Sequence, residues 1–334
     1  MKKEEKKEDN FKKASPKEIR DFAEKIKKIK AEMSKVVVGQ EKTIDSFLRA
    51  IICNGHVLVE GVPGIAKTLI IKVLGAVSGC DVKRVQFTVD LLPTDIVGLT
   101  IYRQGKGFEV IKGPIFANFL IADEINRSPP KTQSALLEAM QEKQVTIGRE
   151  TFFLPKPFFV MATANPIEQS GVYNLPEAQV DRFLFKVIMD YTTREDEKEI
   201  LKKNTDFFNI TDFKLKKIIS PNEIIIMQNL VKGIYVSEQI REYILNIVSA
   251  TRDKKKNYSK YIEWGASPRA TMGLFIASQA EALMNGRDFV TPQDVKNVSF
   301  DILRHRIMLG YEAEADNLSA DDLIKKILEE TVVP

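Results

Sequence analysis

This sequence of 334 residues has few cysteines, no long apolar run and only a small net charge. Its two cysteines, Cys53 and Cys80, argue against a disulfide framework and favour a reducing compartment. No apolar run approaches the roughly 18–20 residues that a membrane span requires. The charged run MKKEEKKEDNFKK at the N-terminus has no apolar segment behind it, which argues against a secretory signal. Together these absences predict a cytoplasmic protein without a membrane span.

The net charge of +4 at pH 7 is too small to indicate binding to nucleic acid by itself. Hydrophobic residues make up 44% of the chain and charged residues 29%, as in ordinary soluble globular proteins. The chain is long enough for two domains with a sizeable core. Composition alone therefore identifies neither the fold nor the function, and both must be inferred from the order of the motifs.

Strands and helices alternate through the first half of the chain. A helix is expected from Lys17 to about Met33, where apolar residues recur at helical spacing. Another amphipathic helix is expected over PKTQSALLEAMQEK. Apolar segments predict strands at 56–60, 82–87, 116–124, 157–165 and 180–189. This alternation predicts an α/β fold with a mainly parallel sheet and helices on both of its faces.

The character of the chain changes near residue 190, because helix follows helix after about Tyr191. The mixed charges at the N-terminus are typical of a solvated tail. We therefore predict three segments. They are a charged tail over 1–15, an α/β domain over 16–190 and a helical domain over 191–334.

The stretch GVPGIAKT at 61–68 lies between a predicted strand and a predicted helix, which is the context of a phosphate-binding loop. It fits the pattern G-x-x-x-x-G-K-[ST], except that Ala66 replaces the second glycine. In such a loop, backbone N–H groups converge on phosphate oxygens, Lys67 faces the β- and γ-phosphates, and the Thr68 hydroxyl binds Mg²⁺. If position 66 takes φ > 0, the alanine costs on the order of 1–2 kcal/mol, which is a tolerable strain. A simple glycine turn between strand and helix is the alternative that the loop alone leaves open.

Two acids end the strand predicted in FLIADE. Asp123 and Glu124 lie at its carboxyl end, where open α/β sheets bind their ligands. Asp123 at this place can hold the Mg²⁺ shell, and Glu124 can polarise a water for attack on the γ-phosphate. The alternative is a pair of acids at the start of a helix. The lysine loop upstream favours the metal and water roles.

Three further polar residues are candidates for phosphate chemistry. Asn165 ends the next strand and could orient the attacking water, or it could start an Asn-Pro turn. Arg182 could reach the γ-phosphate of a neighbouring subunit, or it could form a surface ion pair with Asp181 or Glu177. Arg269 opens a helix of the second domain. It could touch the phosphates across the interdomain cleft, or it could lie in solvent.

The order of these parts resembles that of AAA+ ATPases, and specifically of the MoxR family. The resemblance covers residues from about 30 to 310. It rests on the stretches VVVGQE, GVPGIAKT, QFTVDLLPTDIVG, KGPIFANFLIADEINRSPPKTQSALLEAMQE, PFFVMATANPIEQSGVYNLPEAQVDRFLF, GASPRA and GRDFVTPQDVKNVSFDILRHR. It implies an AAA+ αβα domain with a parallel sheet, followed by a small all-helical lid, and it implies ATP and Mg²⁺ as ligands. The family also carries alanine at the position of Ala66, whereas Val89 replaces its usual proline, which should affect only a local turn.

The resemblance assigns roles to the site residues. Asp123 and Glu124 become the Walker B pair, with Glu124 as catalytic base. Asn165 becomes sensor 1, Arg182 the arginine finger and Arg269 sensor 2. The adenine pocket is expected at Val38, Gly39 and Gln40. The phosphate-binding stretch is expected at Gly61, Val62, Pro63, Gly64, Ile65, Ala66, Lys67, Thr68 and Leu69.

Two insertions are predicted to form β-hairpins. One covers 97–114 around QGKG, in what would be the second helix of the module, and the other covers 145–157. Both resemble the pore-side insertions of the helix-2-insert and pre-sensor-1 groups, which would face the channel of a ring and touch the substrate. The alternative is a pair of surface hairpins that only pack. Arg127, just beyond the acids, could act between subunits or on substrate, or form a structural ion pair.

The resemblance implies a MoxR-like ATPase that acts as a chaperone to remodel or mature a protein client, which in this family is often a von Willebrand factor A-domain protein. Because a trans-acting finger needs a neighbour at every site, a homo-oligomeric ring is expected, with a hexamer as the favoured number. One alternative is a DNA-acting motor. The hairpins do carry basic residues, but acids lie among them and no nucleic-acid module is appended, so no nucleic acid is expected. A chelatase-type metal-insertion subunit and a binding protein without turnover are further alternatives.

Overall fold

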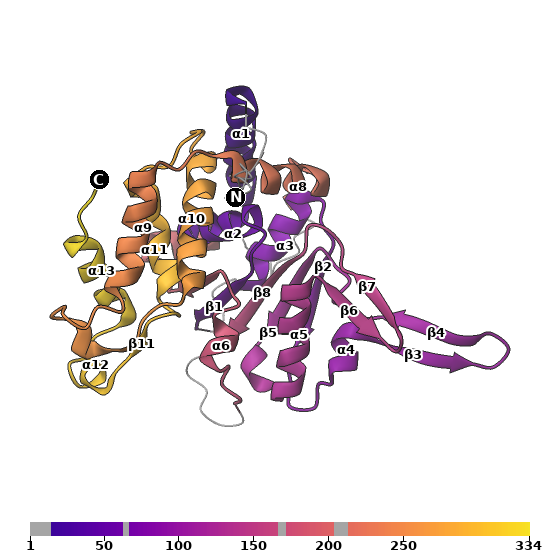
Figure 1. Ribbon diagram of the computed structural model, residues 1–334. Coiled ribbons are helices and arrows are strands. Elements are labelled where there is room, and N and C mark those ends of the chain that lie inside the picture. Colours follow the sequence, from indigo (N-terminus) through magenta and orange to yellow (C-terminus); the bar gives the residue numbers. More distant parts are fainter. Residues whose placement is uncertain (1–14, 63–66, 166–171, 204–212) are drawn as a thin grey trace, which may run out of the picture.

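A five-stranded parallel sheet forms the centre of the molecule. The computed structural model describes residues 15–62, 67–165, 172–203 and 213–334 (Figure 1). The order of the strands is β2-β5-β8-β1-β9, and each neighbouring pair is parallel. The strands are β1 (Val57–Gly61), β2 (Val82–Gln86), β5 (Phe119–Asp123), β8 (Phe159–Ala164) and β9 (Phe185–Met189). The predicted α/β fold with a parallel sheet is therefore confirmed.

Helices cover both faces of this sheet because its central strands β1, β5 and β8 are apolar on both sides. In β1, Val57 and Val59 belong to one buried core, and Leu58 between them belongs to the other. The first core is completed by α1 (Pro16–Met33), α2 (Glu41–Ile52) and α3 (Lys67–Ser78). The second is completed by α4 (Pro93–Val97) and α5 (Pro130–Glu142). Near-continuous burial of this kind is the rule for parallel strands.

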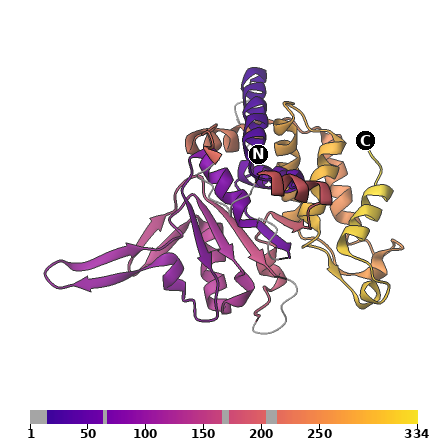
Figure 2. The same ribbon diagram turned by 180° about the vertical axis from the view of Figure 1, so that it is seen from behind.

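A helical lid follows β9. Most of it lies beside the β9 edge of the sheet, whereas its helix Pro221–Leu230 packs against α2 (Figures 1 and 2). Its helices are α7 (Arg194–Lys203), α8 (Pro221–Leu230), α9 (Glu238–Ala250), α10 (Pro268–Met284), α11 (Pro292–Leu303), α12 (Tyr311–Ala315) and α13 (Ala320–Glu330). It also carries a short antiparallel ribbon of β10 (Ile262–Trp264) and β11 (Met308–Leu309). Arg49 of α2 binds Glu281 of α10 with Nε and Oε2 at 2.5 Å, which ties the lid to the sheet domain.

Both predicted insertions form β-hairpins. The first consists of β3 (Gly98–Arg103) and β4 (Gly107–Lys112), and the second of β6 (Gln144–Ile147) and β7 (Glu150–Phe153). The longer hairpin projects from the body on the side away from the lid (Figures 1 and 2). No helix within the described ranges is long and apolar enough to cross a membrane.

The strand predicted at 180–189 begins only at Phe185. The short helix α6 (Glu177–Val180) comes first, and a turn over 181–184 separates it from β9. Backbone carbonyls of this turn accept hydrogen bonds from Arg306, a residue of the lid. Apolar content alone predicted a longer strand because this partner is distant in sequence.

Candidate functional site

The polar residues predicted around the phosphate loop converge at the carboxyl edge of the sheet. β1 ends at Gly61, and α3 begins at Lys67, whose Nζ donates to the Gly61 carbonyl. Thr68 and Leu69 lie half-buried in the first turn of α3, and Val62 follows the strand. Four predicted phosphate-binding residues lie outside the described residues: Pro63, Gly64, Ile65 and Ala66.

Asp123 and Glu124 occupy the end of β5, and the hydroxyl of Thr163 on the neighbouring β8 holds both. Thr163 Oγ1 donates to Asp123 Oδ1 at 2.6 Å and accepts from the Glu124 backbone N–H at 2.8 Å. Glu124 takes the left-handed conformation with φ 56°. Such a backbone costs a non-glycine residue about 1–3 kcal/mol and occurs often at functional sites. It turns the chain sharply where β5 ends.

Residues of β2 add contacts that the motifs did not predict. Arg84 binds Asp123, with Nη2 and Oδ2 at 2.6 Å, and Gln86 Nε2 donates to Glu124 Oε2 at 2.6 Å. Gln86 and Asp123 are register partners in the sheet. The available signal was the polar alternation at 84 and 86, which can be interpreted only once β2 is known to lie beside β5.

Lys67 lies among acidic side chains at this edge of the sheet. Burial lowers the pKa of Lys67, and the charges of Asp123, Glu124 and Glu60 oppose that shift. Lys186 of β9 binds Glu60, with Nζ and Oε1 at 2.8 Å. Because Coulombic effects of this kind fade with distance, Lys67 and both acids belong to one site.

The oxygen ligands at this edge fit Mg²⁺ bound together with phosphates. Asp123 supplies a carboxylate and Thr68 a hydroxyl, both of them hard oxygen donors. In the part of the chain that the structure describes, no three His, Cys, Asp or Glu side chains gather into a protein-only metal cage. Mg²⁺ commonly takes one or two protein oxygens and fills its other positions with water and substrate phosphates.

Asn165 and the predicted adenine residues lie near the same edge. Asn165 follows β8, accepts at its carbonyl from Asn126 Nδ2 at 3.5 Å, and lines a cavity of about 390 Å³ with Glu60. Gln40 Nε2 reaches the carbonyl of Asp190, directly after β9, at 3.4 Å.

Gly39, beside Gln40, has φ 71°, and a Cβ there would lie 2.6 Å from Asp196 Oδ2. Val38, which precedes it, is buried. Their contact with adenine stays a prediction.

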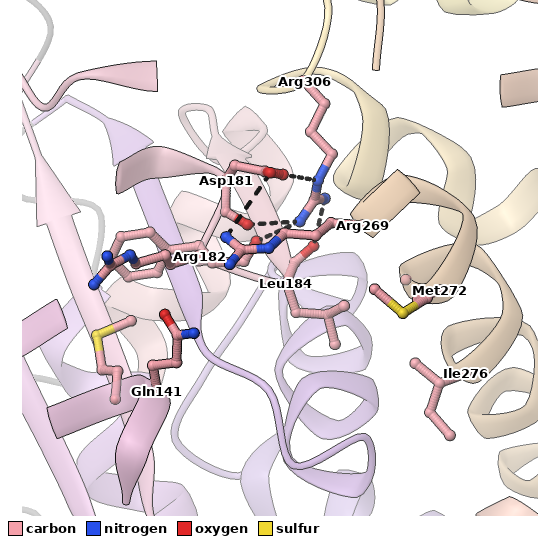
Figure 3. Close-up of a pocket in the computed structure, with 11 residues that line it drawn as sticks. Gln141, Asp181, Arg182, Leu184, Arg269, Met272, Ile276 and Arg306 are labelled. Carbon is pink, nitrogen blue, oxygen red and sulfur yellow. Dashed lines mark hydrogen bonds and ion pairs between the residues drawn. The ribbon is translucent and has the colours of Figure 1, made fainter. Parts of the chain in front are cut away.

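Arg182 and Arg269 lie at the opposite, amino edge of the sheet. Both line a pocket of about 300 Å³ beside the turn that precedes β9, together with Asp181 and Arg306 (Figure 3). The strand β1 of five residues separates this edge from the phosphate loop, a span of roughly 16 Å at about 3.3 Å per residue. Helix α10 starts at this end of the strands, so within one chain Arg269 lies apart from the carboxyl edge, and its contact with phosphates across the interdomain cleft stays a prediction.

Contacts of the neighbouring acids bear on the alternatives for the arginines. Asp181, the suggested ion-pair partner of Arg182, instead binds Arg306 Nε at 2.6 Å and lies 3.9 Å from Arg269 Nη1. Arg182 itself is exposed. Arg127 forms the ion pair that was one of its alternatives, with Nε 3.3 Å from Glu124 Oε2.

Comparison with known proteins agrees with this geometry. Residues 56–185 match the family model "ATPase family associated with various cellular activities (AAA)", and residues 255–327 match "AAA lid domain". The chain is 45% identical over 308 residues to Chaperone MoxR1 of Mycobacterium tuberculosis, covering 91% of this chain and 81% of that protein. It is 29% identical to Protein MoxR of Paracoccus denitrificans, covering 90% and 94%.

A crystal structure described as that of a candidate ATPase from Cytophaga hutchinsonii superposes with a TM-score of 0.88. That chain is 46% identical, and the match covers 95% of this chain and 97% of the other. The matches thus cover both the sheet domain and the helical lid. The chain belongs to the MoxR family of AAA+ ATPases.

Proposed function

We propose that the protein hydrolyses ATP with Mg²⁺ and uses the cycle to remodel or mature a protein client. The observation that carries the proposal is the convergence of Lys67, Asp123 and Glu124 at one edge of the sheet, within electrostatic reach of each other. Lys67 is placed to neutralise the β- and γ-phosphates. Asp123 and Thr68 would hold Mg²⁺, which supplies charge neutralisation for the phosphates.

Glu124 is the proposed general base. The Thr163 hydroxyl fixes its backbone, and the turn at φ 56° takes its side chain out of the strand direction. A carboxylate placed there can accept a proton from the water that attacks the γ-phosphorus. Asn165, at the end of the adjacent strand β8, is proposed to orient that water.

A neighbouring subunit is proposed to complete each site. Arg182 is exposed at the amino edge of the sheet, and the phosphate loop lies at the carboxyl edge, so one chain cannot bring the two together. A head-to-tail contact between copies would do so, and its repetition closes a ring, for which we propose six subunits. Arg269 lies on the same edge, so any contact it makes with phosphate would also be with the neighbour's nucleotide.

The client is proposed to be a protein. The relative from Mycobacterium tuberculosis is named a chaperone, and von Willebrand factor A-domain proteins are the class we propose. On the projecting hairpin, Tyr102 and Phe108 are exposed and pack edge to face with ring centroids 5.4 Å apart. Arg103 on the same hairpin pairs with Glu109, with Nε and Oε2 at 3.3 Å, which weakens its attraction for nucleic acid. Both cysteines are free, which suits the cytoplasm as the proposed compartment.

Glu124→Gln tests the hydrolysis. We expect the steady-state rate of ATP hydrolysis to fall by about 10²-fold or more, as for loss of a general base, while ATP binding is kept. Glu109→Gln on the hairpin makes the same chemical change away from this edge and should leave the basal rate unchanged. Equal rates in wild type and Glu124→Gln would contradict the proposal for this site.

The same variant tests the client. Because Glu124→Gln should stay in its ATP-bound state, an affinity pull-down in ATP is expected to retain a protein that the same pull-down in ADP releases. Recovery of nucleic acid alone, together with DNA-stimulated hydrolysis, would overturn the chaperone proposal in favour of a DNA-acting motor.

A further inference from the structure

Arg306 is a buried arginine that donates four hydrogen bonds to one short turn and one to the preceding helix, α11. It follows α11 in the lid and has only 6% of its surface exposed. Nε donates to Asp181 Oδ1 at 2.6 Å. Nη1 donates to the carbonyls of Ile302 and Leu184 at 2.6 and 3.1 Å, and Nη2 to those of Phe183 and Asp181 at 2.8 and 3.3 Å. A guanidinium has five N–H donors, so every one of them is used.

The turn that Arg306 binds is the one that carries Arg182. The carbonyls of Asp181 and Phe183, the residues on either side of Arg182, both accept from Arg306 Nη2. The Arg182 side chain points away from Asp181 and Arg306 (Figure 3). Arg306 therefore fixes the backbone at Arg182 without occupying its guanidinium.

The Asp181 carboxylate connects this turn to a second element of the lid. Its Oδ2 accepts from Ser267 Oγ at 3.0 Å, and Arg269 Nη1 lies 3.9 Å away. Ser267 caps α10, since its hydroxyl accepts from the Arg269 backbone N–H at 3.2 Å. The start of α10 and the segment after α11 thus both bind the turn. A rotation of the lid would move Arg182 with it.

We propose that Arg306 is a positioning residue. Together with Asp181, it holds Arg182 in the orientation in which Arg182 can contact the ATP of a neighbouring subunit, and it couples the orientation of the lid to that contact. The inference rests on the proposed function, in which Arg182 acts across the subunit contact. Only an arginine suits the role, because lysine has no planar fork that could bind the carboxylate and the carbonyls at once.

The test is a subunit-mixing experiment that separates positioning from folding. One subunit carries Lys67→Ala, which disables its own site but leaves its arginines intact. The other carries Arg306→Gln, which leaves its own phosphate loop intact. Alone, Arg306→Gln should lose about 10²-fold in kcat, the loss expected from a misplaced catalytic group, with little change in KM for ATP. Mixed, the two should hydrolyse ATP faster than either alone, because the Lys67→Ala subunit supplies a correctly held Arg182.

Two controls keep the outcomes distinct. Arg182→Ala mixed with Lys67→Ala must also recover activity; if it does not, the trans arrangement of the proposed function is wrong. If that control recovers and Arg306→Gln does not, or if Arg306→Gln alone keeps the wild-type kcat, the positioning role is wrong. Asp181→Asn removes the charge that joins Arg306 to Ser267 and keeps the side chain's size. It should give the same pattern with a smaller loss in kcat. It also serves as the second variant if Arg306→Gln is too unstable to purify.

Discussion

Lys143 and His56 lie in contact at the amino end of β1, with Lys143 Nζ 2.6 Å from His56 Nε2. The Val160 N–H donates to Nδ1 at 3.0 Å, so Nε2 must carry the ring proton, and it lies 3.1 Å from the Met140 carbonyl. An ammonium facing that N–H has no lone pair to accept it, whereas a neutral amine has one. Burial lowers the pKa of Lys143 to about 8, which also favours the neutral amine.

The lowered pKa of Lys143 predicts that folding stability depends on pH. Its folded pKa of about 8 is below the ordinary value near 10.4. Between these values the unfolded chain binds a proton that the folded chain does not, so stability rises with pH. Lys143→Met should remove this rise, on the order of 1–3 kcal/mol, and should raise stability at pH 7, where the buried ammonium is unfavourable. Urea unfolding of both proteins at pH 7 and pH 9 measures it.

The matched control is Lys106→Met, which removes one exposed lysine from the hairpin turn. It corrects for the loss of a single positive charge. If Lys143→Met and wild type gain stability in parallel from pH 7 to pH 9, the lowered pKa is not present in solution.

Single residues also show how far the sequence predicted the site. Lys67, Asp123 and Glu124 were predicted because each has a motif and a strand or helix next to it. Arg84 and Arg306 were missed because their partners, Asp123 and Asp181, lie 39 and 125 residues away. Local sequence patterns do not reveal contacts of that kind, because such contacts depend on the order of the strands and the placement of the lid.

At the scale of elements, the base of the β3–β4 hairpin depends on two glycines. Gly98 has φ 110°, and a Cβ there would lie 2.2 Å from the Ile111 carbonyl oxygen. A Cβ on Gly113 would lie 2.2 Å from that of Ile96. In both cases the obstacle is backbone, which cannot rotate away as a side chain can. The hairpin therefore joins α4 and β3 through positions where only glycine fits.

Gly98→Ala is expected to loosen this hairpin. The left-handed φ alone costs about 1 kcal/mol, and the collision with backbone adds to it. Hydrogen exchange should rise through β3 and β4. Gly105→Ala is the matched control, since Gly105 also has a left-handed φ of 84° but no atom within 4 Å of a Cβ. Equal exchange in the two variants would show that the base of the hairpin is not constrained by close approach.

The elements themselves were largely predictable. All five predicted strands exist, and both hairpins are present. The central strands were predictable because buried parallel strands form short apolar runs. The order of the strands was not predictable, since it depends on packing between distant segments. The ribbon of β10 and β11 was also missed, because β11 has only two residues and no pattern. The domain boundary near residue 190 stays a prediction.

At the scale of the whole molecule, the site is divided between two edges of one sheet. Lys67, Asp123 and Glu124 lie at the carboxyl ends of the strands, and Arg182 and Arg269 lie beside their amino ends. The division follows from the parallel topology, because all five strands run the same way. A chain built like this offers an incomplete phosphate site at one edge and arginines at the other.

Mixing Lys67→Ala with Arg182→Ala subunits tests this division most directly. Each variant alone should hydrolyse ATP at a small fraction of the wild-type rate, since removal of an arginine finger costs about 10³-fold or more in kcat. In the mixture, the intact phosphate loop of one subunit should meet the intact Arg182 of the other. We predict that the mixed rate rises well above the sum of the two separate rates. A mixed rate equal to that sum, with subunits shown to co-assemble, would contradict a site shared between neighbours.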